Sequence, residues 1–147
     1  MDEPLGRQLA TTGRVVQDGF DRRLARHGSS LSTWMVLRTA AREEGLSQRE
    51  LASRVRVEGP TLVRHLDRME QDGLVVRRRD ERDRRVVRVC LTEAGRARHA
   101  ELRAVAAHVD RELRSLLTVD EAHTLEGLLQ RIRDGWHPLA GNGSDPA

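Results

Sequence analysis

The stretch LSQRELASRVRVEGPTLVRHLDRMEQDGLVVRRRDERDRRVVRVCL, residues 46–91, decides the fold. It begins with two short helical patterns that a tight turn joins. A β-hairpin pattern rich in arginine follows directly. We therefore predict that two packed helices and a two-stranded hairpin form the centre of a mainly helical protein.

The first helical pattern starts at Ser47. Ser47 and Glu50 form an S-x-x-E capping box, in which each side chain binds a free backbone amide of the first turn. Leu46 and Leu51 stand at the two positions of a hydrophobic staple, which fixes how the chain enters a helix. We expect this helix to end near residues 54–55.

The second helical pattern opens at Glu58-Gly59-Pro60 and stops at Gly73. Proline is favoured at the first helical position, and a left-handed glycine commonly follows the last one. At about 100° per residue, one side of this helix is apolar and should pack on the core. That side consists of Leu62, Val63, Leu66 and Met69.

The opposite side of the second helix is polar and basic. Arginine can form two hydrogen bonds with the edge of guanine, and threonine can contact a thymine methyl group or a base edge. A solvated helix also shows such a face, but its place between a capped helix and a basic hairpin favours DNA. Arg64 is near the helix start and suits a base, whereas Arg68 suits a phosphate. The predicted DNA contacts from both helices are Ser47, Gln48, Thr61, Arg64, His65 and Arg68.

The hairpin pattern has Leu74–Val76 in its first strand and Val86–Leu91 in its second, with residues 77–85 between them. Arginine at a hairpin tip has the shape and charge that suit a narrow minor groove, although a charged loop can also be simply solvated. We predict that Arg82, Arg84 and Arg85 contact DNA, and that Asp83 forms an ion pair with Arg85. Two helices followed by a basic hairpin define a winged helix-turn-helix.

The excess positive charge of the chain lies in this stretch. Residues 47–91 hold 12 Arg and 8 Asp or Glu, whereas the remaining residues hold 14 Arg and 15 Asp or Glu. The net charge of +3 therefore comes from the proposed DNA-binding part. Clustered arginine neutralises phosphates and releases their counterions, which favours binding to nucleic acid.

Six segments carry a family resemblance: LSQRELA (46–52), PTLVR (60–64), LDRME (66–70), GLV (73–75), DRR (83–85) and LTEAG (91–95). Together they resemble the multiple-antibiotic-resistance regulator (MarR) family of transcription factors. The resemblance covers most of the chain, and DRR with the following LTEAG is its most specific part. It implies a homodimer that binds double-stranded DNA as a repressor or activator, often released by a small ligand or oxidant. Gly59 departs from it, since a polar residue more often stands there.

Apolar periodicity predicts four further helices. They cover residues 5–24, a segment from an N-cap at Ser32 to Gly45, a long segment from Thr92 to about Leu116, and a last one that a capping box at Thr118 and Glu121 begins. Their apolar faces exceed what one small winged helix needs, and the resemblance places the dimer interface there. We expect dimerisation helices in residues 1–30 and 100–137, the winged-helix core in 31–99 and a disordered tail in 138–147.

Length and composition predict one soluble domain, because the 147 residues are 37% hydrophobic and 33% charged. No stretch approaches the roughly 20 apolar residues of a membrane span. The first residues lack the features of a signal peptide. A single cysteine excludes an internal disulfide and suits a reducing compartment. We predict a cytoplasmic protein with no membrane partner.

Three large apolar side chains, Phe20, Trp34 and Met35, lie in the first two predicted helices, and Arg38 stands one turn beyond Trp34. Core packing is the simpler interpretation of Trp34. Many members of the resembled family bind aromatic acids, however, and pockets of this kind combine an apolar lining with a few polar anchors. We therefore predict a small, anionic or phenolic effector between the second helix and the dimerisation helices, with Arg38 meeting its carboxylate.

The chain shows no motif for catalysis. A P-loop, GxGxxG, HExxH and the G-x-S-x-G elbow are absent, and the six histidines are scattered. We predict no enzyme activity, no metal and no cofactor, and we interpret Cys90 as a half-buried apolar residue rather than a thiol sensor.

The function that these patterns favour is a sequence-specific transcriptional regulator, a homodimer on a pseudo-palindromic operator. We expect it to be a repressor that a small effector releases. The alternative is a winged-helix module for protein–protein contact without a DNA target, and the basic hairpin with the polar face of the second helix argues against it.

Overall fold

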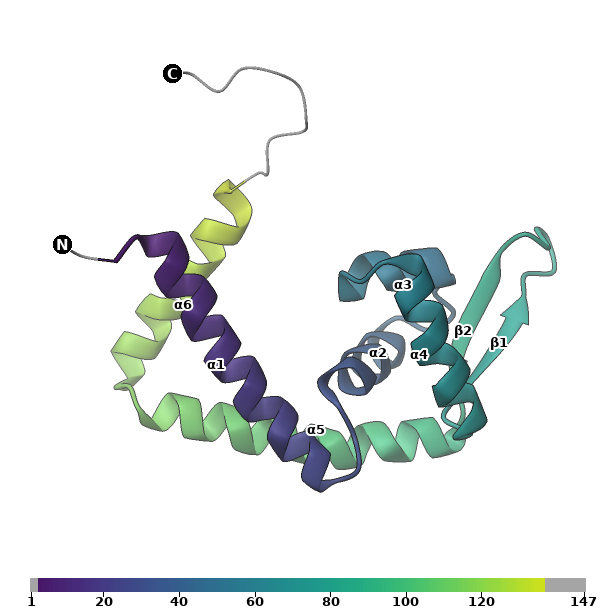
Figure 1. Cartoon of the computed structure of the whole chain (residues 1–147), viewed down its shortest axis with the longest axis horizontal. Helices are drawn as coiled ribbons and strands as arrows, with labels where there is room; N and C mark the ends of the chain where they lie inside the picture. The colour runs from purple at the N-terminus through teal and green to yellow at the C-terminus, as the bar shows by residue number, and fades with distance from the viewer. Residues whose placement is uncertain (1–2, 137–147) are drawn as a thin grey trace, which may run out of the picture. The chain divides into compact units, whose positions relative to one another are not determined.

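The computed structural model describes residues 3–136 (Figure 1). The prediction of a mainly α protein with one small β-hairpin is confirmed. None of the described helices is both long and apolar enough to cross a membrane. The tail predicted for residues 138–147 lies outside the described residues. The elements are α1 (Leu5–Arg26), α2 (Leu31–Arg42), α3 (Gln48–Val55), α4 (Gly59–Gln71), β1 (Val75–Arg79), β2 (Val87–Leu91), α5 (Glu93–Ser115) and α6 (Val119–Gly135).

The chain divides into two compact units, residues 1–107 and 108–147. The division falls within α5, so the first unit contains α1 to β2 and the start of α5. The second unit contains the end of α5 and α6. The sequence predicts one domain with dimerisation helices at both ends, and that assignment of roles stays a prediction.

One hydrophobic core holds the first unit together. Leucines from five helices lie at its centre, and valines of both strands close it on the side of the hairpin. Full burial of such a side chain stabilises the fold by about 1.5–3 kcal/mol, so this core fixes the helices and the base of the hairpin as one body. The side chains less than 2% exposed include Leu24, Leu37, Leu51, Leu62, Leu66, Leu102, Val75 and Val89.

One residue predicted on the apolar side of α4 lies outside this core. Val63 is 36% exposed, so its assignment to the buried face was wrong. Leu62, Leu66 and Met69 fall within a narrow arc of the helix, whereas Val63 is turned by about 100° from Leu62. It therefore lies at the edge of the apolar side, where the core no longer covers it.

Polar side chains set the starts of α2 and α3. The capping box predicted at Ser47 is present, since its hydroxyl accepts the Glu50 amide at 3.1 Å and the Glu50 carboxylate accepts the Ser47 amide at 2.8 Å. The prediction of Ser32 as the cap of α2 was wrong. Ser30 is the N-cap and accepts the Thr33 amide at 3.2 Å, which starts the helix two residues earlier than expected.

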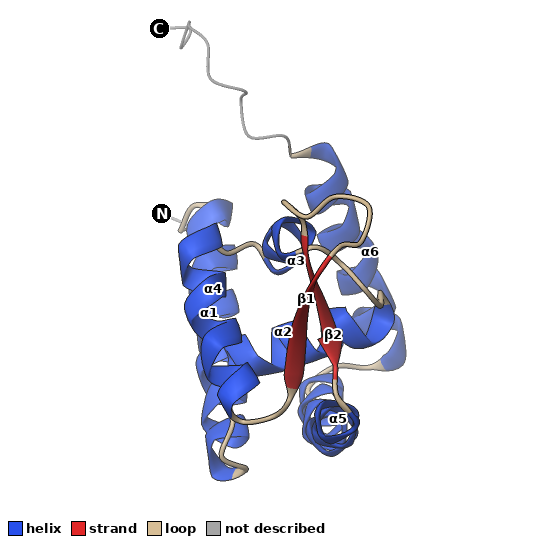
Figure 2. Cartoon of the chain, turned by 90° about the vertical axis from the view of Figure 1, so that its right-hand side faces the viewer, coloured by secondary structure: helices blue, strands red, loops and turns tan. Residues whose placement is uncertain are grey.

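The hairpin is longer than predicted on its first strand. β1 pairs with β2 from Val75 opposite Leu91 to Arg79 opposite Val87, so the prediction that Arg77 belongs to the loop was wrong. A strand continues where its partner strand offers backbone hydrogen bonds. Residues 77–79 therefore extend β1 beyond its apolar residues, because they pair with residues 87–89 of β2. Figure 2 shows the twisted pair of strands and the loop beyond them.

The LTEAG segment joins the hairpin to α5 through two close contacts. The Thr92 hydroxyl donates to the Gly73 carbonyl at 2.5 Å and accepts the Gly95 amide at 3.0 Å, which caps α5 as predicted. A Cβ on Gly95 would overlap the Leu74 carbonyl oxygen. Only glycine allows this approach, so the motif fixes how α5 leaves the base of the wing.

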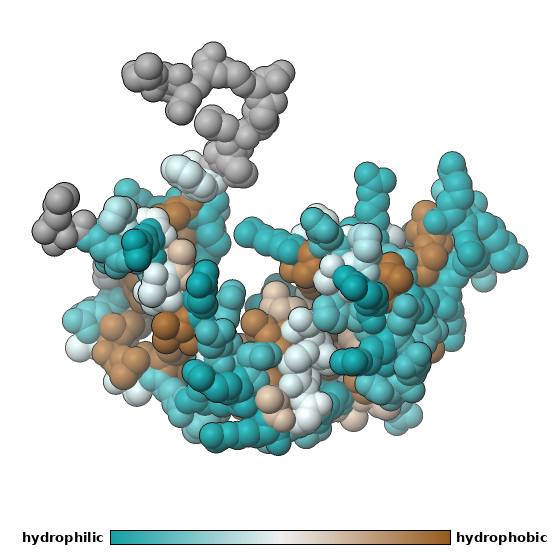
Figure 3. All heavy atoms as spheres, viewed as in Figure 1, coloured by the Kyte–Doolittle hydropathy of each residue, from teal (hydrophilic) through white to brown (hydrophobic). Residues whose placement is uncertain are grey.

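The second unit exposes a large apolar surface. A capping box of Thr118 and Glu121 starts α6 as predicted. Leu113 near the end of α5 and Leu116 just after it are 38% and 78% exposed. In Figure 3 apolar side chains gather at the turn between α5 and α6. The exposed apolar residues of this unit are Leu113, Leu116, Leu117, Val119, Leu125, Leu128, Ile132 and Trp136.

Candidate nucleic-acid interface

Helix α4 buries one face and presents the other to solvent. Leu62, Leu66 and Met69 are within the core. Arg64 and Arg68, on the opposite side, are exposed. The start of the helix, Gly59-Pro60, is also exposed.

Thr61 and His65 are each half-buried at the border of the exposed face of α4. In the helical projection both lie on the same side of Arg64, within about 100° of it, so the three side chains form one polar patch. The structure therefore brings together the side chains that were assigned to base contacts, while Arg68 lies one turn further along the helix.

The start of α3 contributes Ser47 and Gln48, which are both half-buried. The Ser47 hydroxyl accepts a hydrogen bond as the helix cap and keeps its own hydrogen available for donation to an acceptor. The Gln48 carbonyl oxygen accepts from the Arg77 guanidinium at 3.4 Å, which leaves its amide group to donate. Both side chains thus retain a donor for a phosphate.

The wing loop is an ordered turn built on Asp80. Its carboxylate accepts the backbone amides of Arg82 and Asp83 at 2.8 and 3.0 Å. Arg88 of β2 donates to the same carboxylate at 2.6 Å. The bond from Arg88, helped by the two amides, lowers the pKa of Asp80. Arg82 and Arg84 stand exposed beyond this turn, as expected for side chains that reach into a groove.

The ion pair predicted between Asp83 and Arg85 is confirmed. The guanidinium of Arg85 donates to both carboxylate oxygens, at 3.0 and 3.1 Å. This contact lowers the pKa of Asp83 and raises the pKa of Arg85. The Arg85 side chain is nevertheless 91% exposed, so the pair orients the guanidinium without covering it.

Two arginines that tie the wing to the helices were not predicted from the sequence. Arg77 binds Asp67 and Glu70 of α4, and Arg88 donates to the Gly45 carbonyl at 2.9 Å as well as to the wing turn. The strand alternation places Arg77 on the same face as a buried valine, which is a signal that the sequence does contain. The prediction failed because it placed Arg77 in the loop.

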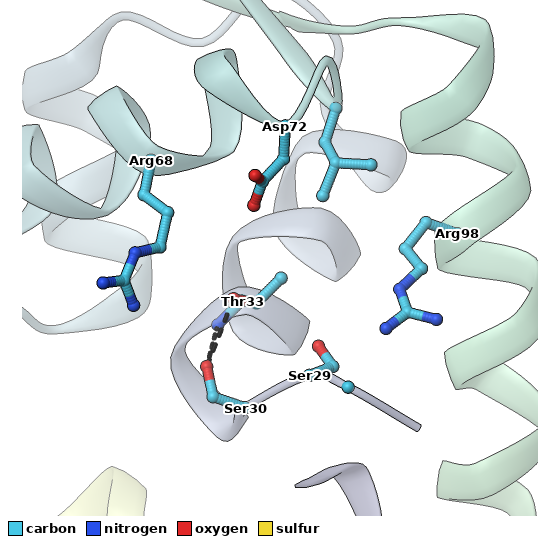
Figure 4. A pocket seen from close by; sticks show the side chains of 8 residues that line it. Ser29, Ser30, Thr33, Arg68, Asp72 and Arg98 are labelled. Carbon is cyan, nitrogen blue, oxygen red and sulfur yellow. Dashed lines mark hydrogen bonds between the residues drawn. The ribbon is translucent and has the colours of Figure 1, made fainter. Parts of the chain in front are cut away.

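A cavity of about 380 Å³ lies where the start of α2 meets the end of α4 and the start of α5. Figure 4 shows Arg68 of α4 and Asp72, the residue that follows α4, on one side of the cavity, with Thr33 below them and Arg98 of α5 across it. Arg68 therefore borders this cavity as well as the exposed face of α4. Its lining is Gly28, Ser29, Ser30, Thr33, Arg68, Asp72, Leu74 and Arg98.

The residues predicted for an effector divide between core and surface. Trp34 is only 6% exposed and stacks on His99 of α5, with ring centroids 5.5 Å apart. Phe20 meets the edge of Trp34 at 6.2 Å, and Met35 packs against the core. Arg38 is exposed. The structure thus brings the three apolar side chains close to the core and leaves Arg38 on the surface.

Known proteins share both this fold and this sequence pattern. The MarR family model matches residues 30–87. The transcriptional regulator PA3341 is 38% identical over 90% of this chain and 97% of its own, with a TM-score of 0.79. The transcriptional repressor CouR, in a structure bound to a 23-mer DNA duplex, is 30% identical over 88% and 92%, with a TM-score of 0.83. The apo form of MarR from E. coli is 28% identical over 90% and 98%, with a TM-score of 0.80.

The winged helix-turn-helix and these similarities define the chain as a DNA-binding transcriptional regulator. It belongs to the MarR family.

Replacing Arg82 and Arg84 together with alanine is expected to weaken DNA binding while the oligomeric state and the melting temperature stay nearly unchanged. Both side chains are exposed, and the bond from Arg79 to residue 84 goes to its backbone carbonyl, which alanine keeps. The dependence of log affinity on log salt should flatten by about 0.9 for each phosphate that the variant no longer neutralises. The measurement is a salt titration of DNA binding beside a thermal melt.

The matched control for the wing variant replaces Arg14 and Arg22 of α1, which are exposed and away from the hairpin. It removes the same charge and should leave the salt dependence unchanged. Equal DNA affinity of the wing variant and the wild type would contradict a wing that contacts DNA.

Proposed function

We propose that the protein acts as a homodimer that represses transcription from a pseudo-palindromic operator and releases the DNA when a small effector binds. The observation that carries this proposal is that each chain has one exposed recognition face on α4 and a wing beside it. Two such faces related by a twofold axis would enter major grooves about one turn, roughly 34–36 Å, apart.

The surface of α6 supports the homodimer. Leu125, Leu128 and Ile132 recur at helical spacing and are 44%, 47% and 37% exposed. An exposed stripe of large apolar residues on a charged protein is typical of a surface that another chain covers. A second copy of this chain presents the same stripe, so a twofold contact buries it on both subunits.

The assignment of residues to DNA is part of this proposal. Arg64, with Thr61 and His65 beside it, is proposed to read base edges, and Arg68 to hold a phosphate. Ser47 and Gln48 are proposed to donate hydrogen bonds to the DNA backbone. Arg82, Arg84 and Arg85 are proposed to contact DNA from the wing. CouR, 30% identical, has been captured on a duplex and supports this placement. Footprinting on DNA upstream of the gene tests it, with protection in two symmetric halves as the expected result.

Regulation by an effector rests on the aromatic contact between α1, α2 and α5. Phe20, Trp34 and His99 come from these three helices and meet at their junction. Burial, and then the charge of Arg103, lowers the pKa of His99, which favours the neutral form of its stacked ring. An aromatic acid that took the place of one ring would shift the helices and with them α4. Such an effector must prefer the shifted state, because equal affinity for both states shifts nothing.

Trp34→Phe and Arg38→Ala are expected to impair release of DNA by an aromatic acid. Trp34 supplies the stacking surface, and exposed Arg38 is proposed to pair with the carboxylate once the helices move. The measurement is a panel of aromatic acids added to the protein–DNA complex, with wild type and both variants compared at equal occupancy of DNA. Release that is equally efficient from all three proteins would show that the effector binds elsewhere.

The proposed place of action is the cytoplasm, where a single cysteine stays reduced, and no catalytic role is proposed. The alternative function is a winged helix that contacts only another protein. A filter-binding assay with duplex DNA distinguishes it from a DNA-binding regulator. The exposed arginines of α4 and the wing favour DNA.

A further inference from the structure

Arg77 stands where three elements of the winged helix meet. Because side chains alternate along a strand, Arg77 shares the inner face of the hairpin with Val75. Val75 is 1% exposed, and Arg77, the next residue on this face, lies at the point where the hairpin leaves the core. From there the long arginine side chain reaches both helices of the helix-turn-helix.

The guanidinium of Arg77 bridges α4 and α3. Its Nε donates to the Glu70 carboxylate at 2.7 Å, and its NH2 group donates to the Asp67 carboxylate at 2.5 Å. Its NH1 group donates to the side-chain oxygen of Gln48 at 3.4 Å. Bonds between a guanidinium and carboxylates are charge-assisted and directional, so they fix both distance and orientation.

The environment of Arg77 differs from that of the wing-tip arginines. Its side chain is 21% exposed, compared with 91% for Arg85. Partial burial acts to lower the pKa of Arg77, but the bonds to Asp67 and Glu70 outweigh it and raise the pKa. At least three of its five N–H donors are directed at groups of the protein rather than at solvent.

The two carboxylates lie on the flank of the recognition helix. At about 100° per residue, Asp67 and Glu70 fall between the buried face of α4 and the face that carries Arg64. A contact there ties β1 to the side of α4 without covering the proposed base-reading surface. It therefore sets the spacing between the helix and the wing.

We propose that Arg77 is a positioning residue for DNA binding, which holds β1 against α4 so that the recognition helix and the wing enter their grooves together. The inference rests on the proposed placement of α4 and the wing on DNA. Arg77 acts through Asp67 and Glu70 and does not itself contact DNA.

Arg88 anchors the other face of the hairpin. It binds Asp80 at the wing turn and the carbonyl of Gly45 before α3. The amide of Val89 also donates to the Leu46 carbonyl at 2.9 Å. These contacts hold the strand β2 to the start of α3, but none of them reaches α4. Only Arg77, among the side-chain contacts described for residues 3–136, links the wing strands to carboxylates of the recognition helix.

Hydrogen exchange on the free protein tests this clamp without DNA. Arg77→Met keeps an unbranched side chain similar to the aliphatic part of arginine and removes the donors, so amides of residues 76–90 should exchange about tenfold faster, a change of roughly 1.4 kcal/mol in local opening. Amides in α2 should be unchanged. Arg78→Met is the control, because Arg78 is the next residue on β1, exposed and on the opposite face. Unchanged exchange in Arg77→Met, or an equal change in the control, would overturn the proposal.

Binding to a duplex selected from a random pool by the wild-type protein then tests the consequence. Arg77→Met should bind about tenfold more weakly and lose the wing's minor-groove protection from hydroxyl radicals, while major-groove protection by α4 remains. Failure of the wild type to select any duplex would refute the proposed function and leave the exchange result standing. The two failures are therefore distinguishable.

Two further variants separate positioning from charge. Adding Asp67→Asn and Glu70→Gln to Arg77→Met removes the unpaired carboxylates. We expect DNA binding by this triple variant to stay weak, because the spacing between α4 and the wing is not restored. If the triple variant instead recovered its affinity for DNA, the role of Arg77 would be to neutralise the charge of Asp67 and Glu70. Arg77→Lys keeps the charge but cannot bind both carboxylates in the fork geometry, so it should also lose minor-groove protection. Wild-type protection in Arg77→Lys, or a global loss of the fold in every Arg77 variant, contradicts a positioning role.

Discussion

Arg64→Ala is expected to weaken binding to the selected duplex by about 1–3 kcal/mol and to reduce its preference over unrelated duplexes. Arg64 is exposed in the first half of α4, where a recognition helix reaches base edges. Leu62 and Leu66 on the opposite face fix the helix to the core, so removal of the guanidinium changes the surface and not the fold. The measurement compares affinities for the selected duplex and for a scrambled one.

Arg68→Ala is the matched control for Arg64→Ala. Arg68 lies one turn later and is also exposed, and it borders the cavity at the end of α4 together with Asp72. Its removal should weaken all sequences about equally and flatten the salt slope by about one, as expected for a phosphate contact. An equal reduction of sequence preference in both variants would contradict the separate roles of the two arginines.

Leu128→Glu is expected to dissociate the proposed dimer and, as a consequence, to abolish binding to the full operator. Leu128 is 47% exposed in the middle of the apolar stripe of α6. In a twofold interface the substitution places two carboxylates in an apolar contact, and an uncompensated buried charge costs about 3–5 kcal/mol. Sedimentation should show a monomer at a concentration at which the wild type is a dimer, with helix content unchanged.

His123→Glu adds a carboxylate to the same helix on the side opposite Leu128, where His123 is exposed. It should leave both the dimer and operator binding unchanged. A dimer that survives Leu128→Glu, or that both variants destabilise equally, would show that the stripe on α6 is not the interface.

The fold was predictable because its signals are local. The capping boxes at Ser47 and Thr118, the proline at the start of α4 and the glycine after its end all act within one turn of the chain. Hydrophobic period then selects the buried faces, which the core leucines confirm. The predicted start of α2 was wrong because Asp21 of α1 accepts the Leu31 amide at 2.7 Å, and this support comes from a residue ten positions away.

The candidate site was predictable only in part. Side chains that point outward from a single helix or loop, such as Arg64 and Arg82, follow from periodicity and from the place of a turn. The bonds from Arg77 to Gln48 and from Arg88 to Gly45 join residues that lie far apart in the chain, and no local pattern specifies these partners. The stacking of Trp34 on an α5 histidine is also nonlocal, which is why the sequence pointed to the tryptophan and not to its partner ring.

Sedimentation velocity of the wild-type chain with the selected duplex tests the central claim most directly. We expect a dimer at micromolar protein, two chains on each full-site duplex, and affinity that falls steeply with salt as counterions are released. A monomer that shows no DNA binding at low salt would contradict a dimeric DNA-binding regulator.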